Sequence, residues 1–365
     1  MPVFMDLHSV PGITAKDAAL AHYEDLKVQD QYGCKCMTYW VDEKRDSAFC
    51  LIEAPDKEAV IKMHGVAHGL IPHEIIQVDS NIVQAFLGRI HDPAFFSELT
   101  NPDVKIFNDP AFRIILICKT MDMQIVYSKI RNDKARQIVD EFKNIFKTEV
   151  ESCNGTEVKF RNDINLASFV SVSQALNCAI SLNRNIKQSK DLLDFKITLH
   201  AGTPVEESDS IFGSTIQFAE DLCFVASNSK VILSPLIKDL CIDTNNATYH
   251  KENELKCITN EEEQTLKSLM KVLRSSYLNP NFDGTFFSES IGMSKSNLYR
   301  KCVSLTGFSP NNLIRNYRLI QSIFLLNKGC SISQTAFDSG FSSPSYFSKC
   351  FQKRFGIQPY NFKNL

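Results

Sequence analysis

Apolar positions near the start of the chain alternate, change to helical spacing, and then repeat this sequence of patterns. The predicted elements are, in order, a strand (2–8), a helix (14–31), two strands around a turn (34–42 and 46–53), a helix (55–68) and a strand (73–79). Thr14 and Asp17 form a capping box at the first helix, and Gly69 ends the second. The order strand, helix, strand, strand, helix, strand predicts an α+β domain over residues 1–80.

A connector and a second domain follow. Residues 81–110 contain three Pro and mixed polarity, which breaks any long helix, so we expect a linker that packs in part. Residues 111–260 mix strand-like and helical segments, which predicts an α/β domain with helices over a sheet. The segments are a strand (111–119), a helix (132–147), a hairpin (158–171), a helix (173–186), a strand (195–207), a helix (211–226), and a strand with a last helix (230–240).

The last part of the chain, residues 261–365, contains one pattern twice at an offset of 49 residues. SKSNLYRKCVSLTGFSP begins at Ser294, and SPSYFSKCFQKRFGIQP begins at Ser343. Each copy has a short helix, a Gly-containing turn and a capped second helix, which is the arrangement of a helix-turn-helix. Residues 310–327 predict a connecting helix roughly 27 Å long. Successive major-groove faces lie about 34 Å apart, so an all-α domain of this kind suits double-stranded DNA.

Charge is distributed unevenly between these parts. The whole chain of 365 residues has a formal net charge of −2, which alone would not favour nucleic acid. Residues 261–365, however, hold thirteen Lys and Arg against six Asp and Glu, a charge of +7, so the other 260 residues carry −9. A basic end on an acidic body fits phosphate attraction confined to one domain. Solvation of helix faces is the plainer alternative for the charge alone, but the repeated motif argues against it.

Cysteines and hydropathy bear on the compartment. The twelve Cys are scattered without a paired framework, and several lie in apolar runs, so we expect reduced, mostly buried thiols. The chain has no cationic start with an apolar core, and no apolar run approaches about 18 residues. We therefore expect a cytoplasmic protein without a membrane partner.

Five of the eight His fall in residues 1–80. His64 and His68 are four residues apart, so both imidazoles project from one face of the second helix, in its last turn. Pairs at this spacing bind Zn, Ni or Cu, although many are only part of a polar surface. MPVFMDLHSVPG, QYG, YWVDE, FCLIEAPD, HGVAHG and IPHEII resemble a small family of ferredoxin-like proteins with a nickel-binding member. The resemblance implies a transition metal such as nickel, with His64 and His68 as leading ligands and His8, His22 and His73 as further candidates.

The repeated C-terminal pattern also resembles a known family. GFSSPSYFSKCFQKRFGIQP matches the signature of the AraC/XylS transcription regulators almost throughout, over about the last hundred residues. The resemblance implies seven helices, two helix-turn-helix units and transcriptional control. Side chains early in each second helix face the groove floor and would contact bases, whereas later basic ones would contact phosphates. The first group is Lys295, Ser296, Asn297, Arg300, Ser343, Ser345, Tyr346 and Lys349, and the second is Lys301, Lys353 and Arg354.

The middle domain contains LHAGTPVEESDSIFGSTIQFAEDL and KVILS, together with NDINLASF and DPAFRIIL. These segments resemble the class III adenylyl/guanylyl cyclase homology domain. That family holds two metals on two Asp and uses an Asn and an Arg on a helix. Asp163 stands at the second Asp, but Lys119 stands at the first, and Gln217 and Asp221 replace Asn and Arg. We therefore predict no cyclase activity.

The sequence thus predicts a multidomain protein: ferredoxin-like (1–80), linker (81–110), cyclase-like (111–260) and double helix-turn-helix (261–365). We expect a sequence-specific transcription regulator that senses a signal through its N-terminal parts, and not an enzyme. Because cyclase domains pair about a twofold axis, we expect a homodimer through the N-terminal or the cyclase-like domain. The alternatives are a nucleotide cyclase-type enzyme and a metal-storage protein with an accessory DNA-binding domain.

Overall fold

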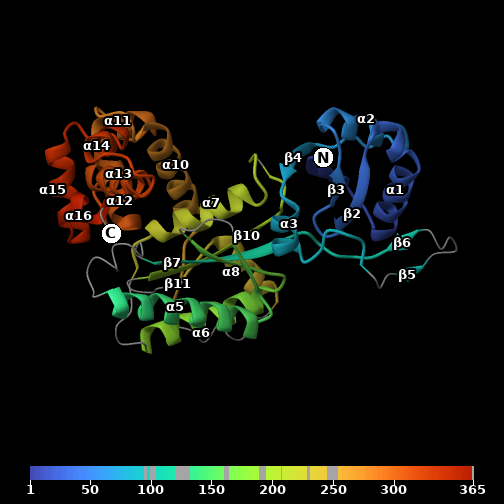
Figure 1. The fold of residues 1–365 in the computed structure, drawn as a ribbon, viewed down its shortest axis with the longest axis horizontal. Coiled ribbons are helices and arrows are strands. Elements are labelled where there is room, and N and C mark those ends of the chain that lie inside the picture. The colour runs from blue at the N-terminus through green and yellow to red at the C-terminus, as the bar shows by residue number, and fades with distance from the viewer. Residues whose placement is uncertain are drawn as a thin grey trace.

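The computed structural model describes residues 1–93, 97–98, 104–120, 132–159, 164–188, 195–206, 208–227, 231–244 and 254–363. The elements gather into three bodies that follow one another along the molecule (Figure 1). The N-terminal body lies at one end, the helical C-terminal body at the other, and the largest sheet between them. Within the described ranges, no helix is long and apolar enough to cross a membrane.

The N-terminal body is a four-stranded antiparallel sheet with the strand order β2-β3-β1-β4. Its elements are β1 (Val3–Ser9), α1 (Ala15–Val28), β2 (Lys35–Asp42), β3 (Ser47–Glu53), α2 (Lys57–Ala67) and β4 (Glu74–Val78). The capping box of Thr14 and Asp17 begins α1, and Asp56 caps α2. Both the element order and the ferredoxin-like strand order match the prediction.

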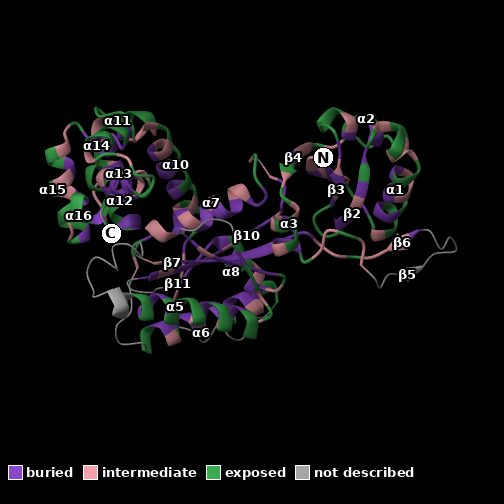
Figure 2. Ribbon diagram, in the orientation of Figure 1, coloured by how far each residue is buried: buried purple, intermediate pink, exposed green. Residues whose placement is uncertain are grey.

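Both faces of this sheet are buried. Because side chains alternate along a strand, each strand contributes residues to both faces. Phe4 and Ile52 pack with Val60 and Met63 of α2 on one face. On the other face, Met5, Trp40, Phe49 and Leu51 join a cluster that continues into the middle body. The N-terminal domain therefore shares a core with its neighbour. Figure 2 shows β2 and β3 coloured largely as buried.

The predicted linker contains a helix, α3 (Ser80–Leu87), which Asp79 caps and Gly88 ends with φ of +82°. Two arginines, one half-buried and one buried, hold the segment in place. Arg89 binds Asp109 at 2.9 Å. The guanidinium of Arg113 donates hydrogen bonds to four carbonyl oxygens, those of Phe86, Leu87, Pro110 and Phe112. This arginine therefore joins the end of α3 to the first strand of the middle sheet.

The middle body is a mixed six-stranded sheet with the order β12-β11-β10-β7-β9-β8. Its strands are β7 (Arg113–Thr120), β8 (Thr156–Val158), β9 (Asn165–Phe169), β10 (Phe195–Gly202), β11 (Val231–Leu233) and β12 (Leu255–Cys257). Helices α5 (Asn132–Ser152) and α6 (Val172–Gln188) cover one face, and α7 (Gly213–Asp221) lies on the other (Figure 1). A further helix, α8 (Pro235–Asp243), packs with α6. A short hairpin of β5 (Ser97–Glu98) and β6 (Lys105–Ile106) lies beside the N-terminal body.

The C-terminal body is all helical, with seven helices between residues 260 and 363. They are α10 (Asn260–Ser276), α11 (Gly284–Ser290), α12 (Lys295–Thr306), α13 (Pro310–Asn327), α14 (Ile332–Asp338), α15 (Pro344–Phe355) and α16 (Pro359–Lys363). Ser294 and Ser343 cap α12 and α15 as predicted. Gly307 and Gly356 end these helices with φ of +74° and +78°, a conformation that glycine adopts without strain.

Helix α7 connects the cores of all three bodies. Its residues Ile216 and Ala219 belong to the cluster shared with the N-terminal domain, together with Phe212 just before it. Phe218 belongs to the cluster shared with the C-terminal domain. At its end, the buried carboxylate of Asp221 accepts two hydrogen bonds from Arg274 of α10, at 2.8 and 3.0 Å.

Candidate functional site

The candidate metal site lies between the sheet and the two helices of the N-terminal domain. Asp6 and His8 are two residues apart on β1, so both point to the helix-covered face, and Cys50 of β3 is the register partner of Asp6. Asp25 of α1 and His64 of α2 extend from the helices that cover this face toward the sheet. Two groups of side chains have ligand atoms within 4.8 Å of one another: Asp6, His8, Cys50 and His64, and Asp25, His64 and His68.

His64 is fully buried and hydrogen-bonded through both ring nitrogens. Nε2 lies 2.8 Å from Asp6 Oδ2, and Nδ1 lies 2.9 Å from Asp25 Oδ1. Burial alone would lower the pKa of His64, but the carboxylates outweigh it and raise the pKa to about 10. Burial would raise the pKa of Asp6, yet His8 and His64 hold it below its usual range. At neutral pH this is an imidazolium between two carboxylates.

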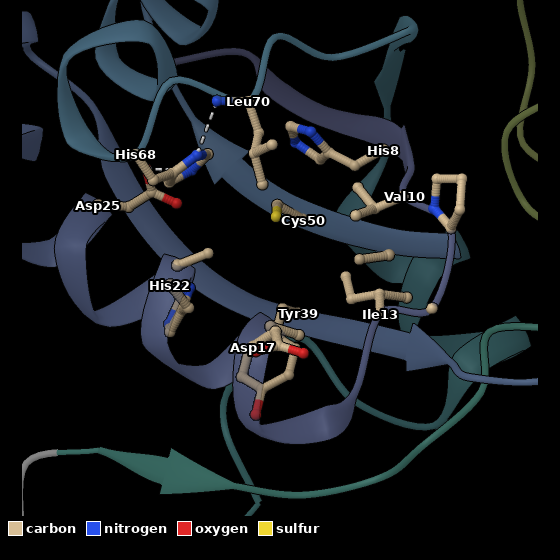
Figure 3. A pocket seen from close by; sticks show the side chains of 15 residues that line it. His8, Val10, Ile13, Asp17, His22, Asp25, Tyr39, Cys50, His68 and Leu70 are labelled. Carbon is tan, nitrogen blue, oxygen red and sulfur yellow. Dashed lines mark hydrogen bonds and ion pairs between the residues drawn. The ribbon is translucent and has the colours of Figure 1, made fainter. Parts of the chain in front are cut away.

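His68 lies at the edge of the same group. Its Nε2 is 3.2 Å from Asp25 Oδ1 and 3.0 Å from His64 Nδ1. The backbone N–H of Leu70 donates to Nδ1 at 3.1 Å (Figure 3). This bond fixes the orientation of the ring, so that one nitrogen faces the cluster.

His8 differs from both. It is only 4% exposed, and within the described part of the chain neither of its ring nitrogens has a hydrogen-bond partner. Its Nε2 lies 3.5 Å from Asp6 Oδ1, and its ring centroid lies 4.9 Å from that of His64. Buried polar atoms without partners are uncommon, because each one costs about 1–3 kcal/mol. A bound ion would supply the missing partner.

A cavity of about 140 Å³ adjoins this cluster. His8, Asp25, Cys50 and His68 lie on its wall (Figure 3). Imidazole nitrogen, thiolate and carboxylate are donors that first-row transition metals such as nickel accept. The donor set and the unpartnered imidazole therefore fit such an ion. A bound ion would supply a divalent positive charge beside Asp6 and Asp25.

The five predicted histidines occupy different places. His8, His64 and His68 come together, whereas His22 lines the same cavity from α1, with Nε2 3.9 Å from Asp92 Oδ1. His73 Nδ1 accepts from the backbone N–H of Ser9 at 3.2 Å, outside both groups. Sequence reasoning missed the non-histidine members, which are Asp6, Asp25 and Cys50. The Asp6–His8 pair at strand spacing is a signal that would have found part of the set.

The predicted DNA-contacting side chains of the first unit lie on and around α12. Lys295, Ser296 and Arg300 are exposed, and Asn297 is half-buried. Lys301 is engaged elsewhere, because it donates to Glu261 at 3.1 Å. Three side chains of the unit therefore stand free for a groove.

The second unit has a similar face on α15. Ser345, Tyr346, Lys349 and Lys353 are exposed. The hydroxyl of Ser343 accepts from the backbone N–H of Tyr346 at 3.2 Å, so this serine serves as the helix cap. The side chain expected on phosphate, Arg354, is exposed and donates from Nε to Asn316 at 2.9 Å. Leu298, Phe347 and Phe351 are buried, as the helical spacing predicted.

The cyclase-like positions form no recognisable catalytic set among the described residues. Asp163 lies outside the described residues. Lys119 is on β7, whereas Gln217 and Asp221 are on α7. Asp221, which stands where the resemblance implied an Arg, binds Arg274 of the C-terminal domain.

Family comparisons place the two ends of the chain. Residues 287–364 match a family model described as a helix-turn-helix domain, and residues 4–78 match one described as nickel responsive protein SCO4226-like. The chain thus carries an N-terminal SCO4226-like domain and a C-terminal AraC-type helix-turn-helix domain.

Individual proteins match parts of the chain. "Histidine kinase P4" of Formosa agariphila is 39% identical over 29% of this chain and 8% of its own length. The HTH-type transcriptional activator RhaS of Mannheimia succiniciproducens is 34% identical over 20% of this chain and 27% of its own. The chain spans between 8% and 58% of the lengths of the curated relatives that it matches.

Solved structures match other parts. SCO4226 of Streptomyces coelicolor A3(2) is 35% identical, covers 21% of this chain and 94% of its own, and has a TM-score of 0.20. A bacterial light-regulated adenylyl cyclase is 14% identical, covers 66% of this chain and 88% of its own, and has a TM-score of 0.32.

Proposed function

We propose that this protein is a DNA-binding transcription regulator whose N-terminal domain binds a transition metal, nickel foremost, and whose C-terminal domain contacts the operator. The observation that carries the metal part is His8, a buried imidazole whose two nitrogens have no hydrogen-bond partner among the described residues, beside a thiol, carboxylates and two more imidazoles. The helix-turn-helix match carries the DNA part.

The two recognition helices support contact with two adjacent groove segments. Helix α13 has 18 residues, a length of roughly 27 Å, and connects the two units. Exposed Lys295 and Arg300 on α12, and Lys349 on α15, supply charge and hydrogen-bond donors for bases and phosphates.

The packing of α7 supports communication between the two sites. A metal changes DNA binding only if the two arrangements of the protein differ in metal affinity. Helix α7 contributes to the core under the sensing domain through Ile216, and to the core under the DNA-binding domain through Phe218. A rearrangement of the core beneath the N-terminal domain would therefore displace α7. The Asp221–Arg274 pair would pass this displacement to α10.

Mapping of bound genomic sites with and without added nickel tests this function. We expect a defined set of sites whose occupancy changes with nickel, and the recovered motif then allows affinity measurements in solution. There, nickel should change the DNA affinity of the wild type by at least about fivefold, in line with typical coupling energies. Light scattering on the complex gives the number of copies per site, for which we expect two.

The matched variant for that experiment is His8→Phe, which keeps a buried ring and removes both nitrogens. It should bind the same DNA and no longer respond to nickel. Equal responses of wild type and variant would contradict a role for this cluster, and failure to enrich any sites would contradict the regulator.

Replacing Arg300 with Ala should cost about 1–3 kcal/mol of binding free energy on the operator and relax the base preference near that side chain. The reason is that an exposed Arg on the recognition helix can bond guanine through two donors. Selection on random DNA followed by anisotropy titration measures both effects. The control is Lys271→Ala, on the exposed side of α10, which should leave the motif unchanged. An unchanged motif for Arg300→Ala would count against base contact.

A further inference from the structure

The cavity beside the histidine cluster is larger than a metal ion requires. It encloses about 140 Å³, whereas one water molecule needs roughly 10–15 Å³ of such space. An ion held by His8 and its neighbours would occupy one end only. The rest of the cavity has room for a small molecule.

The two ends of the cavity differ in chemistry. One end presents ligand atoms from His8, Cys50 and His68 (Figure 3). Leu70 lies beside His68 at this end. The remaining apolar side chains of the wall are those of Val10, Pro11, Ile13, Ala18 and Ala21. A metal at the polar end would therefore keep some coordination positions that no protein ligand fills, and these would point toward the apolar side chains.

The charges around the cavity restrict what fits there. Among the described residues that line it, two are carboxylates, Asp17 and Asp25, and none is Lys or Arg. An anionic chelate, such as a divalent ion with citrate, would be repelled. A divalent ion with one amino acid carries a charge of +1, because the amine binds as a neutral donor and the carboxylate brings one negative charge. Because the His64 imidazolium pairs with Asp25, Asp17 is the lining carboxylate whose charge this pair does not balance, and a complex of charge +1 suits such a wall.

We propose that the cavity takes the metal together with one small chelator of the amino-acid type, whose amine and carboxylate complete the coordination and whose body lies against the apolar end. This inference rests on the proposed metal site and names the form in which the ion is bound. His8, Cys50 and His68 hold the ion, and Ile13, Ala18 and Ala21 contact the organic part.

Equilibrium dialysis of the full chain tests the proposal with Ni²⁺ alone, with Ni²⁺ and one equivalent of labelled L-histidine, and with labelled L-histidine alone. We expect about one histidine retained per bound nickel and none without nickel. Labelled citrate with Ni²⁺ should not be retained. When both are supplied, nickel retained without histidine would overturn the proposal, and so would citrate retained as well as histidine.

Two variants separate this inference from the metal site itself. Ala21→Leu, on α1, narrows the apolar end and should reduce histidine retention at least tenfold while nickel alone still binds. Lys16→Leu adds the same side chain on the exposed side of α1 and should behave as wild type. Equal histidine retention by wild type and Ala21→Leu refutes the chelate. If the wild type binds no nickel in either arm, the proposed metal function is refuted as well.

Discussion

Replacing Asp6 with Asn should destabilise the N-terminal domain by about 3 kcal/mol, because a buried imidazolium loses one of its two carboxylates. Asp6 is 1% exposed and accepts from His64 Nε2 at 2.8 Å and from the backbone N–H of Cys50 at 3.0 Å. Trp40, the single Trp of the chain, is fully buried in this domain, so its fluorescence during urea unfolding measures the loss.

The matched control is Asp30→Asn, at an exposed position after α1, which should change stability by less than about 0.5 kcal/mol. Similar unfolding midpoints for the two variants would mean that the buried pair adds little to the fold.

The same pair predicts how stability depends on pH. The folded pKa of Asp6 lies below its usual 3.8, so its contribution is present above about pH 4 and is lost as the pH falls further. The folded pKa of His64 is raised from 6.5 to about 10, so its contribution is complete below pH 6.5 and is lost as the pH rises toward 10. Asp6→Asn should flatten the alkaline part of the profile, because the pKa of His64 then falls.

Replacing Arg113 with Met should cost about 3–5 kcal/mol and loosen the contact between the N-terminal and middle bodies. The guanidinium is 3% exposed and donates to four carbonyl oxygens at 2.6–3.2 Å. Methionine fills similar space but leaves these acceptors without a donor, and each buried one costs about 1–3 kcal/mol. Urea unfolding measures the loss, and acrylamide quenching of Trp40 detects the loosened contact.

Lys143→Met is the control for this experiment, because Lys143 is exposed on α5. It should unfold like the wild type. If Arg113→Met also unfolds within about 1 kcal/mol of the wild type, the carbonyls are solvated and the arginine is not what joins the two bodies.

Local signals predicted most of the elements, although they assigned α3 to a linker and did not predict β12. Thr14 with Asp17 predicted the start of α1, and Ser294 and Ser343 predicted the starts of α12 and α15, because each cap depends on residues within one turn. Alternation predicted the strands of the N-terminal sheet for the same reason. The offset of 49 residues predicted two equivalent helix-turn-helix units without any long-range information.

The candidate metal site was only partly predictable. Helical spacing placed His64 beside His68, but spacing carries no information about which carboxylates a sheet brings to them. Asp6 and Asp25 reach His64 across 58 and 39 residues of sequence, and together they engage both of its nitrogens. His8, a secondary candidate in the sequence, is the imidazole whose two nitrogens both lack a hydrogen-bond partner among the described residues.

The sequence by itself determined the three-part order of the chain, its helix caps, its repeated helix-turn-helix and the histidine-rich start, because these depend on contacts between near neighbours. Only the tertiary structure decided that neither nitrogen of His8 finds a hydrogen-bond partner among the described residues, that Asp221 meets Arg274, and that α7 contributes to the cores at both ends. These outcomes depend on contacts between side chains that are distant in sequence. Local sequence patterns carry no information about which of these side chains meet.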